Sequence, residues 1–322
     1  MGDKNRICAL LNIEYPILCG GMQWLSRAEL VAAVSNGGGL GFLSATTFPD
    51  KAALVEEIRR TQRLTDKPFG VNISMLPGKS AAERAGAYME AVVETGVPVV
   101  ETSGRSPGEF VELLHSHGIK LIHKVPAVRY AKKAEEVGAD AVTVVGFECG
   151  GHPGLDDVPG LVLIPQAAKA LHIPLLAGGG IADARGYLAA RMLGADGVVM
   201  GTRFLLSEEC GIHPRFRERL LHTDETGTKV IQYSIRNPIR ALHNRAADQV
   251  AEMERQHAGL EQLLTVTNGQ NGRRCWMEGD TENGIQAVGQ CVGLIHDVKP
   301  AGEIIREIMS GAEELAASFR LP

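Results

Sequence analysis

Residues 173–204, IPLLAGGGIADARGYLAARMLGADGVVMGTRF, form the stretch of this chain that decides its fold. A short apolar run at 175–177 leads directly into three glycines at 178–180. A helical pattern follows at 184–193, and a second apolar run comes at 197–200. Strand, glycine turn, helix and strand in this order predict one unit of a parallel α/β fold.

Both predicted strands of this unit end in turns that carry little side chain, the glycines at 178–180 and the pair Gly201 and Thr202. Small residues let a ligand approach the backbone, and the exposed N–H groups can donate to it, so such turns can bind a phosphate. In an eight-stranded α/β barrel, the loops after the seventh and eighth strands often do so. The alternative is that these glycines only end strands and helices.

Eight short apolar runs occur along the chain, without the alternation of half-exposed strands, as expected for parallel strands buried on both faces. Amphipathic segments separate them. The count of eight predicts a TIM (β/α)₈ barrel, and the lack of a GxGxxG motif after the first run disfavours a doubly wound sheet. The predicted strands are 16–18, 40–44, 69–73, 99–102, 121–124, 141–145, 175–177 and 197–200, and the predicted helices are 27–36, 50–64, 81–95, 107–117, 128–137, 164–171 and 184–193.

The repeating pattern breaks after the eighth run. Residues 207–285 are more charged and irregular, with helical patterns and no strand-like run. Residues 303–319 then predict an amphipathic helix that completes the barrel as its eighth. We therefore predict a barrel domain at 1–206 and 300–322, with a small, mostly helical insertion at 207–299 that covers the barrel mouth.

Composition narrows the class of protein. The 322 residues have a net charge of −5, which argues against general nucleic-acid binding. We find no apolar run of about 18 residues that would span a membrane and no secretory signal at the N-terminus. The six cysteines are scattered without CxxC spacing. These features predict a cytoplasmic protein with reduced thiols, no bound metal, and neither nucleic acid nor membrane as a partner. A homodimer is compatible with the sequence.

Two capping interactions are predicted at helix starts. Ser26, with Glu29 three residues on, has the spacing of a capping box for the helix at 27–36. Asp156 and Asp157 follow the sixth strand, where they could bind a metal or cap the next helix; we favour the cap.

The chemistry of a TIM barrel lies at the C-terminal ends of its strands. Lys124 ends the fifth predicted strand, and His152 lies in a glycine-rich loop after the sixth. A histidine suits proton transfer, and a lysine can stabilise negative charge. The sequence has no HExxH motif, Ser/His/Asp order or acidic Mg²⁺ cluster. The set therefore suits a phosphate-bearing organic cofactor that performs the difficult chemistry. The alternatives are a purely structural lysine and a loop histidine bonded to backbone.

Six motifs carry a resemblance over essentially the whole chain: YPILCGGMQW, AAVSNGGGLGFLSA, KPFGVNISML, GFECGGHPG, IPLLAGGGIAD and GADGVVMGTRF. Together they resemble the nitronate monooxygenase (2-nitropropane dioxygenase) family of FMN-dependent TIM-barrel oxidoreductases. The resemblance implies FMN as cofactor, oxidation of alkyl nitronates or neutral nitroalkanes with O₂, and His152 as catalytic residue. The FMN contacts that it implies are Gly21, Met22, Gln23, Asn72, Ser74, Lys124, Gly150, Gly178, Gly179, Gly180, Gly201 and Thr202.

Two motifs depart from the common family pattern. Many members have an APM-type first motif and a GGHRG-type histidine loop, whereas this chain has GGMQW and GGHPGLDDVPG. These motifs are similar to those of NAD(P)H:quinone reductases with the same fold, which makes NADH or NADPH as electron donor and a quinone as acceptor the close alternative. The GGM motif is also similar to that of flavin-dependent enoyl-ACP reductases, our third alternative, for which arginines of the insertion would bind the carrier protein. A non-catalytic sensor of a phosphate ligand is the fourth.

Overall fold

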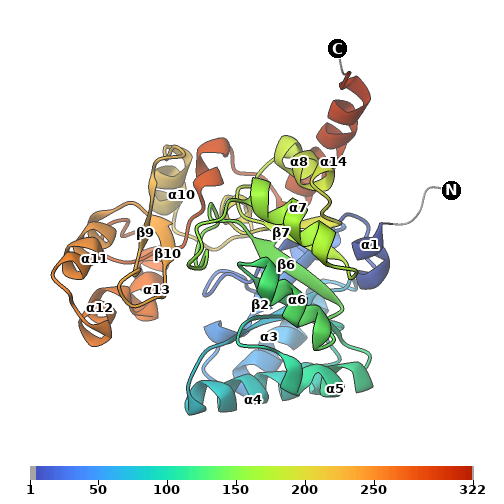
Figure 1. Ribbon diagram of the computed structural model, residues 1–322, viewed down its shortest axis with the longest axis horizontal. Coiled ribbons are helices and arrows are strands. Elements are labelled where there is room, and N and C mark those ends of the chain that lie inside the picture. Colours follow the sequence, from blue (N-terminus) through green and yellow to red (C-terminus); the bar gives the residue numbers. More distant parts are fainter. Residues whose placement is uncertain (1–4, 321–322) are drawn as a thin grey trace.

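The computed structural model describes residues 5–320, and its centre is a closed barrel of eight parallel strands (Figure 1). Each strand pairs with the next along the chain, and β8 closes on β1 through Ile17 and Val198. The predicted TIM barrel is confirmed. The strands are β1 (Ile17–Cys19), β2 (Leu40–Ser44), β3 (Gly70–Met75), β4 (Val99–Gly104), β5 (Lys120–Val125), β6 (Ala141–Val145), β7 (Leu175–Gly178) and β8 (Gly197–Met200).

Helices surround the barrel in the expected order. The last of them packs between α8 and α2, and so takes the eighth place predicted for it. The barrel helices are α2 (Ala28–Asn36), α3 (Lys51–Leu64), α4 (Lys79–Thr95), α5 (Gly108–Ser116), α6 (Val128–Glu136), α7 (Gly160–Ala170), α8 (Ala184–Met192) and α14 (Ala301–Ser318), and a 3₁₀ turn η1 (Ala45–Thr47) precedes α3.

Apolar side chains fill the N-terminal half of the barrel interior. Every second residue of a strand faces inward, and every strand except β3 contributes one or two of them. A short helix that the sequence analysis did not predict, α1 (Arg6–Leu11), adds Ile7 and Leu11 to this cluster and closes that end. The barrel members of the cluster are Leu18, Leu40, Phe42, Val99, Ile122, Ala141, Leu176 and Val199.

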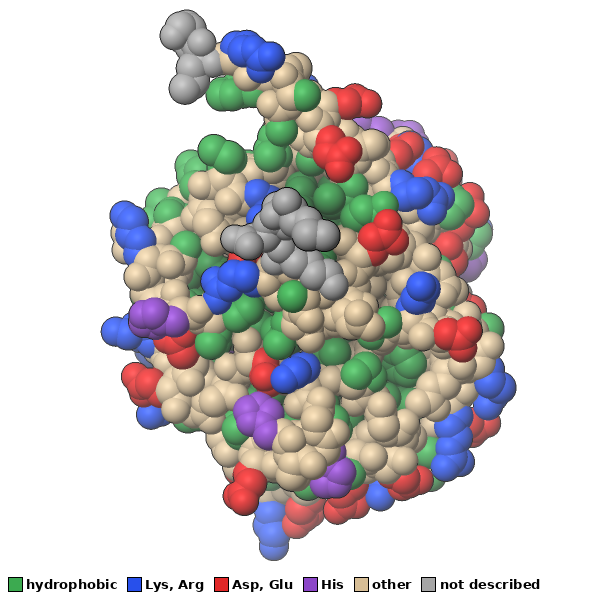
Figure 2. Space-filling model, turned by 90° about the vertical axis from the view of Figure 1, so that its right-hand side faces the viewer, with side chains coloured by type: hydrophobic (Ala, Val, Ile, Leu, Met, Phe, Trp, Pro, Cys, Tyr) green, Lys and Arg blue, Asp and Glu red, His purple; other side chains and the backbone are tan. Residues whose placement is uncertain are grey.

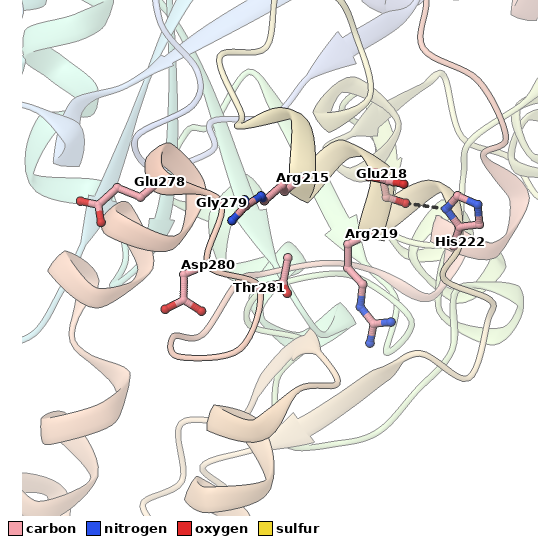
Figure 3. Close-up of a pocket in the computed structure, with 8 residues that line it drawn as sticks. All are labelled: Arg215, Glu218, Arg219, His222, Glu278, Gly279, Asp280 and Thr281. Atoms are coloured by element: carbon pink, nitrogen blue, oxygen red, sulfur yellow. Dashed lines mark hydrogen bonds between the residues drawn. The ribbon is translucent and has the colours of Figure 1, made fainter.

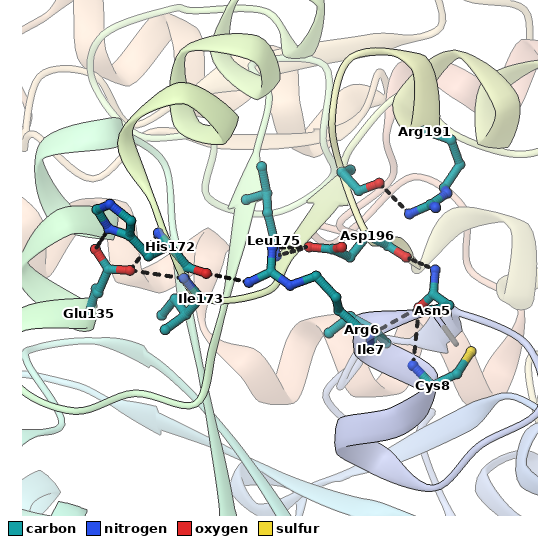
Figure 4. A network of polar contacts seen from close by, with 11 residues as sticks. Asn5, Arg6, Ile7, Cys8, Glu135, His172, Ile173, Leu175, Arg191 and Asp196 are labelled. Atoms are coloured by element: carbon teal, nitrogen blue, oxygen red, sulfur yellow. Dashed lines mark hydrogen bonds and ion pairs between the residues drawn. The ribbon is translucent and has the colours of Figure 1, made fainter. Parts of the chain in front are cut away.

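Polar contacts fasten α1 to the N-terminal end of the barrel (Figure 4). Asn5 caps α1 by accepting from its first amides and donates from Nδ2 to the Asp196 carbonyl at 2.8 Å. The Asp196 carboxylate accepts from the Leu175 N–H at 2.9 Å and pairs with Arg6 at 3.4 Å. This network lies at the barrel end opposite the predicted site.

The insertion contains strands as well as helices, so the expectation of no strands in this region was wrong. β9 (Thr228–Ile231) and β10 (Ile239–Leu242) form an antiparallel pair. Each has only four residues, and β9 is mostly half-exposed, which leaves no long apolar run to detect. The other elements after β8 are α9 (Thr202–Leu205), α10 (Pro214–Leu221), α11 (Arg245–Arg255), α12 (Leu260–Thr267), α13 (Gly269–Glu278) and the 3₁₀ turn η2 (Gln290–Leu294).

The predicted cap of α2 was wrong. Ser26 closes the loop after β1 instead: its hydroxyl accepts from the Met22 N–H at 2.9 Å and donates to the Gly20 carbonyl at 3.2 Å. The first amide of α2 donates to Glu57 on α3, 2.9 Å away. A partner on another helix has no local signal in sequence.

The predicted cap of α7 was also wrong. Asp156 pairs with Arg129 at 2.7 Å, and Asp157 accepts from the Tyr233 hydroxyl at 2.8 Å. The Glu148 carboxylate instead accepts from the Gly160 N–H, at 3.0 and 3.1 Å. Helix α7 therefore begins four residues before the predicted position.

The surface on the side away from the insertion carries acidic and basic side chains in a mixed distribution (Figure 2). Among residues 5–320, no helix is both long enough and apolar enough to cross a membrane.

Candidate active site

A polar layer lies on top of the apolar barrel interior, toward the C-terminal ends of the strands. Glu101 and Lys124 come two residues after Val99 and Ile122 of the interior cluster, so they face inward as well. Oε2 of Glu101 accepts from Asn72 Nδ2 at 2.6 Å and from Lys124 Nζ at 2.8 Å. The Glu101 side chain is fully buried, whereas that of Lys124 is 22% exposed. Lys124 is therefore the charged member of the layer that reaches the barrel mouth.

Two oxygens of this layer have no hydrogen-bond partner among the described residues. They are Oε1 of Glu101 and Oγ1 of Thr143, which pairs with Lys124 in the sheet. Leaving a buried polar group unsatisfied typically costs about 1–3 kcal/mol, so a donor at this position would be strongly favoured. The layer thus keeps hydrogen-bonding capacity that no described residue uses, and Lys124 is its partly exposed member.

The loop after β1 lies against this layer. A Cβ on Gly21 would come within 2.4 Å of the Asn72 Cβ, so only glycine permits this approach. Met22 borders the turn after β8, since a Cβ on Gly201 would lie 3.7 Å from its sulfur. Gln23 is exposed at the mouth. The predicted contacts on β1, β3 and β8 thus meet around one opening.

The glycine turn after β7 packs against the loop after β6. Gly179 and Gly180 have φ of +89° and +74°, which favour glycine. A Cβ on Gly179 would lie 2.9 Å from the Cys149 Cβ, and one on Gly180 would lie 2.7 Å from Glu148 Cγ. These glycines therefore have a packing role in addition to the phosphate role predicted for them.

A segment far along the chain joins the two glycine turns. The Gly289 N–H donates to the Thr202 hydroxyl at 3.0 Å, and a Cβ on Gly150 would lie 2.7 Å from the same nitrogen. The Cys291 thiol interacts with the Thr202 side chain and the Gly180 backbone, and burial raises the pKa of this thiol to about 11. It is therefore uncharged at neutral pH and does not repel an anion. Sequence reasoning missed Cys291 because nothing near it in the chain marks it.

His152 lies in the loop after β6 with an exposed ring, and no described residue hydrogen-bonds to that ring. Gly151 and Gly154 on either side have φ of +82° and +84°. A Cβ on Gly154 would lie 2.6 Å from the Pro126 Cβ, so the loop is shaped by glycine. Part of the ring is accessible to solvent, but most of it is surrounded by protein. This partial desolvation lowers the pKa of His152 below its usual value. The ring is consequently neutral and able to accept a proton at pH 7.

The insertion holds the histidine loop in place. Gly151 and Arg240 of β10 exchange two backbone hydrogen bonds, of 3.0 and 2.7 Å. Arg240 also donates from Nε to the Phe147 carbonyl at 3.1 Å, and its guanidinium lies 4.8 Å from the centre of the Phe147 ring. This clamp could not be predicted from sequence because β10 itself was not predicted.

Most of the predicted residues therefore surround one mouth. Ser74 joins them on β3, with Ser103 Oγ 3.5 Å from its hydroxyl. His123 is buried, and its Nδ1 lies 2.8 Å from the Thr102 hydroxyl, as expected of a structural histidine. The roles assigned to these residues stay predictions.

A hollow of about 650 Å³ lies elsewhere, between α10 and the segment that follows α13 (Figure 3). It contains none of the predicted site residues. Its lining includes Arg215, Arg219 and His222 but also Glu218, Glu278 and Asp280.

Comparison with known proteins places the chain among its relatives. The family model described as nitronate monooxygenase matches residues 4–311. The chain belongs to the nitronate monooxygenase family. This family and its homologues are oxidoreductases that generally use a flavin, so this chain is an oxidoreductase.

The relatives of this nitronate monooxygenase family member have several activities. A probable nitronate monooxygenase of Staphylococcus aureus is 33% identical, with 79% of this chain and 82% of the relative covered. A (3aS,4S,5R,7aS)-5-hydroxy-7a-methyl-1-oxo-octahydro-1H-indene-4-carboxyl-CoA dehydrogenase of Rhodococcus jostii is 31% identical, with 96% of both chains covered. The solved structure of FabK from Thermotoga maritima has a TM-score of 0.91 at 37% identity, with 98% of this chain and 97% of that one covered.

Proposed function

We propose that this chain is an FMN-dependent oxidoreductase that oxidises alkyl nitronates, and neutral nitroalkanes after their deprotonation, with O₂. The observation that carries the proposal is the exposed His152 ring, hydrogen-bonded to no described residue, at the same end of the barrel as the partly exposed Lys124. A general base and a positive charge at the C-terminal ends of neighbouring strands of the barrel suit a substrate that loses a proton and gains negative charge.

The residues present fit FMN. The turns at Gly179 and Gly201 would hold the phosphate through backbone N–H groups, and burial keeps Cys291 between them uncharged. Gly21, Met22 and Asn72 would border the ring system, above the layer that contains Glu101 and Lys124. Bound FMN would supply the electron acceptor and the reaction with O₂.

His152 would act first on a neutral nitroalkane. A ring nitrogen accepts the proton from the carbon next to the nitro group, which leaves the nitronate anion. Lys124 then stabilises negative charge at the mouth, while the clamp from Arg240 keeps the histidine loop in place. A nitronate supplied as the preformed anion needs no base, so His152 would only orient it.

A second candidate is an NAD(P)H-dependent reductase at the same mouth, with a quinone as acceptor. The GGMQW and GGHPGLDDVPG motifs support it, whereas the 37% identity to FabK, an enoyl-ACP reductase, supports reduction of an enoyl-ACP instead. Enoyl-ACP reduction would require a cationic surface for the carrier protein. However, Arg217 donates to backbone carbonyls, including that of Cys210, and Arg240 is buried in the clamp. These two arginines are therefore not available for that surface.

Anaerobic mixing of the FMN-loaded protein distinguishes the candidates. The proposal predicts that ethyl nitronate bleaches the flavin absorbance within seconds, whereas NADH and NADPH leave it unchanged over minutes. Rapid bleaching by NADH and none by nitronate would reject the monooxygenase and favour the reductase. Steady-state oxygen consumption with nitronate then provides the independent check.

A further inference from the structure

Glu101 is a deeply buried charged group of the site, and the chemistry above assigns it no role as a proton donor or acceptor. Its side chain has no exposed surface, its Oε2 accepts from both Asn72 and Lys124, and its Oε1 accepts from no described residue. Burying a carboxylate costs several kcal/mol before its partners compensate. A buried carboxylate that keeps one oxygen without a hydrogen-bond partner therefore needs an explanation other than packing.

Stability alone does not supply that reason. Replacing a buried ion pair by neutral groups of similar volume is often neutral or stabilising. A pair built for strength would also use both carboxylate oxygens, as Glu57 does with Arg27 at 2.7 and 2.9 Å. At Glu101 a single oxygen holds two partners, and both of them belong to the predicted cofactor contacts.

The two partners connect Glu101 to different parts of the mouth. Asn72 supports the loop after β1, because Gly21 packs directly on it. Lys124 is the partly exposed member, and its charge reaches the opening. The Glu101 carboxylate therefore holds both the Asn72 amide, on which the loop after β1 packs, and the Lys124 ammonium of the polar layer.

We propose that Glu101 is a positioning residue that holds Asn72 and Lys124 beneath the FMN and balances the lysine charge there. This inference rests on the proposed function and deepens it. The pair has no net charge as it stands. Removing the carboxylate leaves a positive charge under the flavin, and removing the ammonium leaves a negative one.

These changes have opposite effects on a bound flavin. A positive charge near the flavin favours its electron-rich reduced form, and a negative charge disfavours it. These effects are strong because the polar layer is largely shielded from water. Glu101→Gln should therefore raise the reduction potential of FMN, and Lys124→Met should lower it. The double variant, which is neutral again, should return toward the wild-type potential.

The experiment measures the midpoint potential of FMN in four loaded proteins: wild type, Glu101→Gln, Lys124→Met and the double variant. We expect each single variant to change the equilibrium constant for flavin reduction by about tenfold in opposite directions, which is about 30 mV for a two-electron couple. The double variant should lie within about threefold of wild type. Glu90→Gln is the matched control, because Glu90 pairs with Lys51 at 3.2 Å on the surface and should leave the potential unchanged.

Equal potentials in wild type and Glu101→Gln, or shifts of the same sign in both single variants, would overturn the proposal. If Glu101→Gln fails to retain FMN, the double variant decides: charge balance predicts that it regains FMN and a near-wild-type potential, and a purely steric role predicts that it does not. A wild-type protein that takes up no FMN would refute the proposed function, and this inference with it.

Discussion

Replacing His152 with alanine separates catalysis from cofactor binding. The His152 ring makes no hydrogen bond to a described residue, so its removal leaves no partner unsatisfied. We expect a change of at most about 0.5 kcal/mol in the free energy of unfolding, the usual range for a surface substitution. FMN binding should also be retained, because the predicted phosphate contacts lie on the turns after β7 and β8.

Turnover of a neutral nitroalkane should fall by about 10²-fold or more in His152→Ala, the usual contribution of a positioned base. The assay is oxygen consumption with nitroethane, compared with preformed ethyl nitronate, which needs no deprotonation and should lose much less. In wild type, kcat/KM for nitroethane should fall as the pH drops through the lowered pKa of His152, and this limb should vanish in the variant. Loss of FMN together with unchanged turnover per bound flavin would refute the assignment.

Three further predictions concern other residues. Burial and the neighbouring Lys124 lower the pKa of His123 to about 4. Between pH 4 and 6.5 the unfolded chain, whose histidines titrate near 6.5, therefore binds more protons than the folded one. The free energy of unfolding should fall by up to about 3 kcal/mol as the pH drops from 6.5 to 4. Urea titrations of wild type and His123→Asn measure this fall, and an equal fall in both proteins would contradict the prediction. Cys291→Asp places a negative charge between the two turns and should weaken FMN binding at least tenfold, whereas Cys291→Ser should not; equal dissociation constants in calorimetric titrations would count against the predicted phosphate position. Arg240→Met removes the side-chain part of the clamp, the bond to the Phe147 carbonyl, and keeps the two backbone bonds to Gly151, so kcat for nitroethane should fall severalfold with FMN affinity unchanged; an unaltered kcat in oxygen-consumption assays would show that the Arg240 side chain does not position His152.

The barrel could be predicted from sequence because its strands carry a strong local signal. The runs at Leu40–Ser44, Ala141–Val145 and Gly197–Met200 were predicted with their observed ends, since strands buried on both faces are apolar throughout. The short strands β9 and β10 lack that signal. The start of α7 was missed because its cap, Glu148, lies twelve residues before the amide that it accepts from.

Some residues of the candidate site could likewise be predicted from the sequence, and others could not. His152, Lys124 and the glycine turns could be predicted because each lies at the end of a predicted strand or in the loop that follows it. Glu101 lies within β4, and its importance comes from its bonds to Asn72 on β3 and Lys124 on β5, which sequence does not show. Cys291 and Arg240 reach the site from the far end of the chain and from an unpredicted strand.

The central claim, that FMN binds at this mouth through the glycine turns, is tested most directly at Gly201. Its φ of −111° suits any residue, and a Cβ there would meet only Met22, at 3.7 Å or more. Gly201→Val should therefore preserve the fold while obstructing the approach of a ligand to the backbone. Gly211→Val is the matched control, because Gly211 has open space around its Cβ position.

The measurement is the dissociation constant of FMN, from titration of the apoprotein by flavin fluorescence quenching. We predict an increase of at least tenfold in Gly201→Val and no change in Gly211→Val. Wild-type affinity in a folded Gly201→Val would contradict the account and place the cofactor elsewhere.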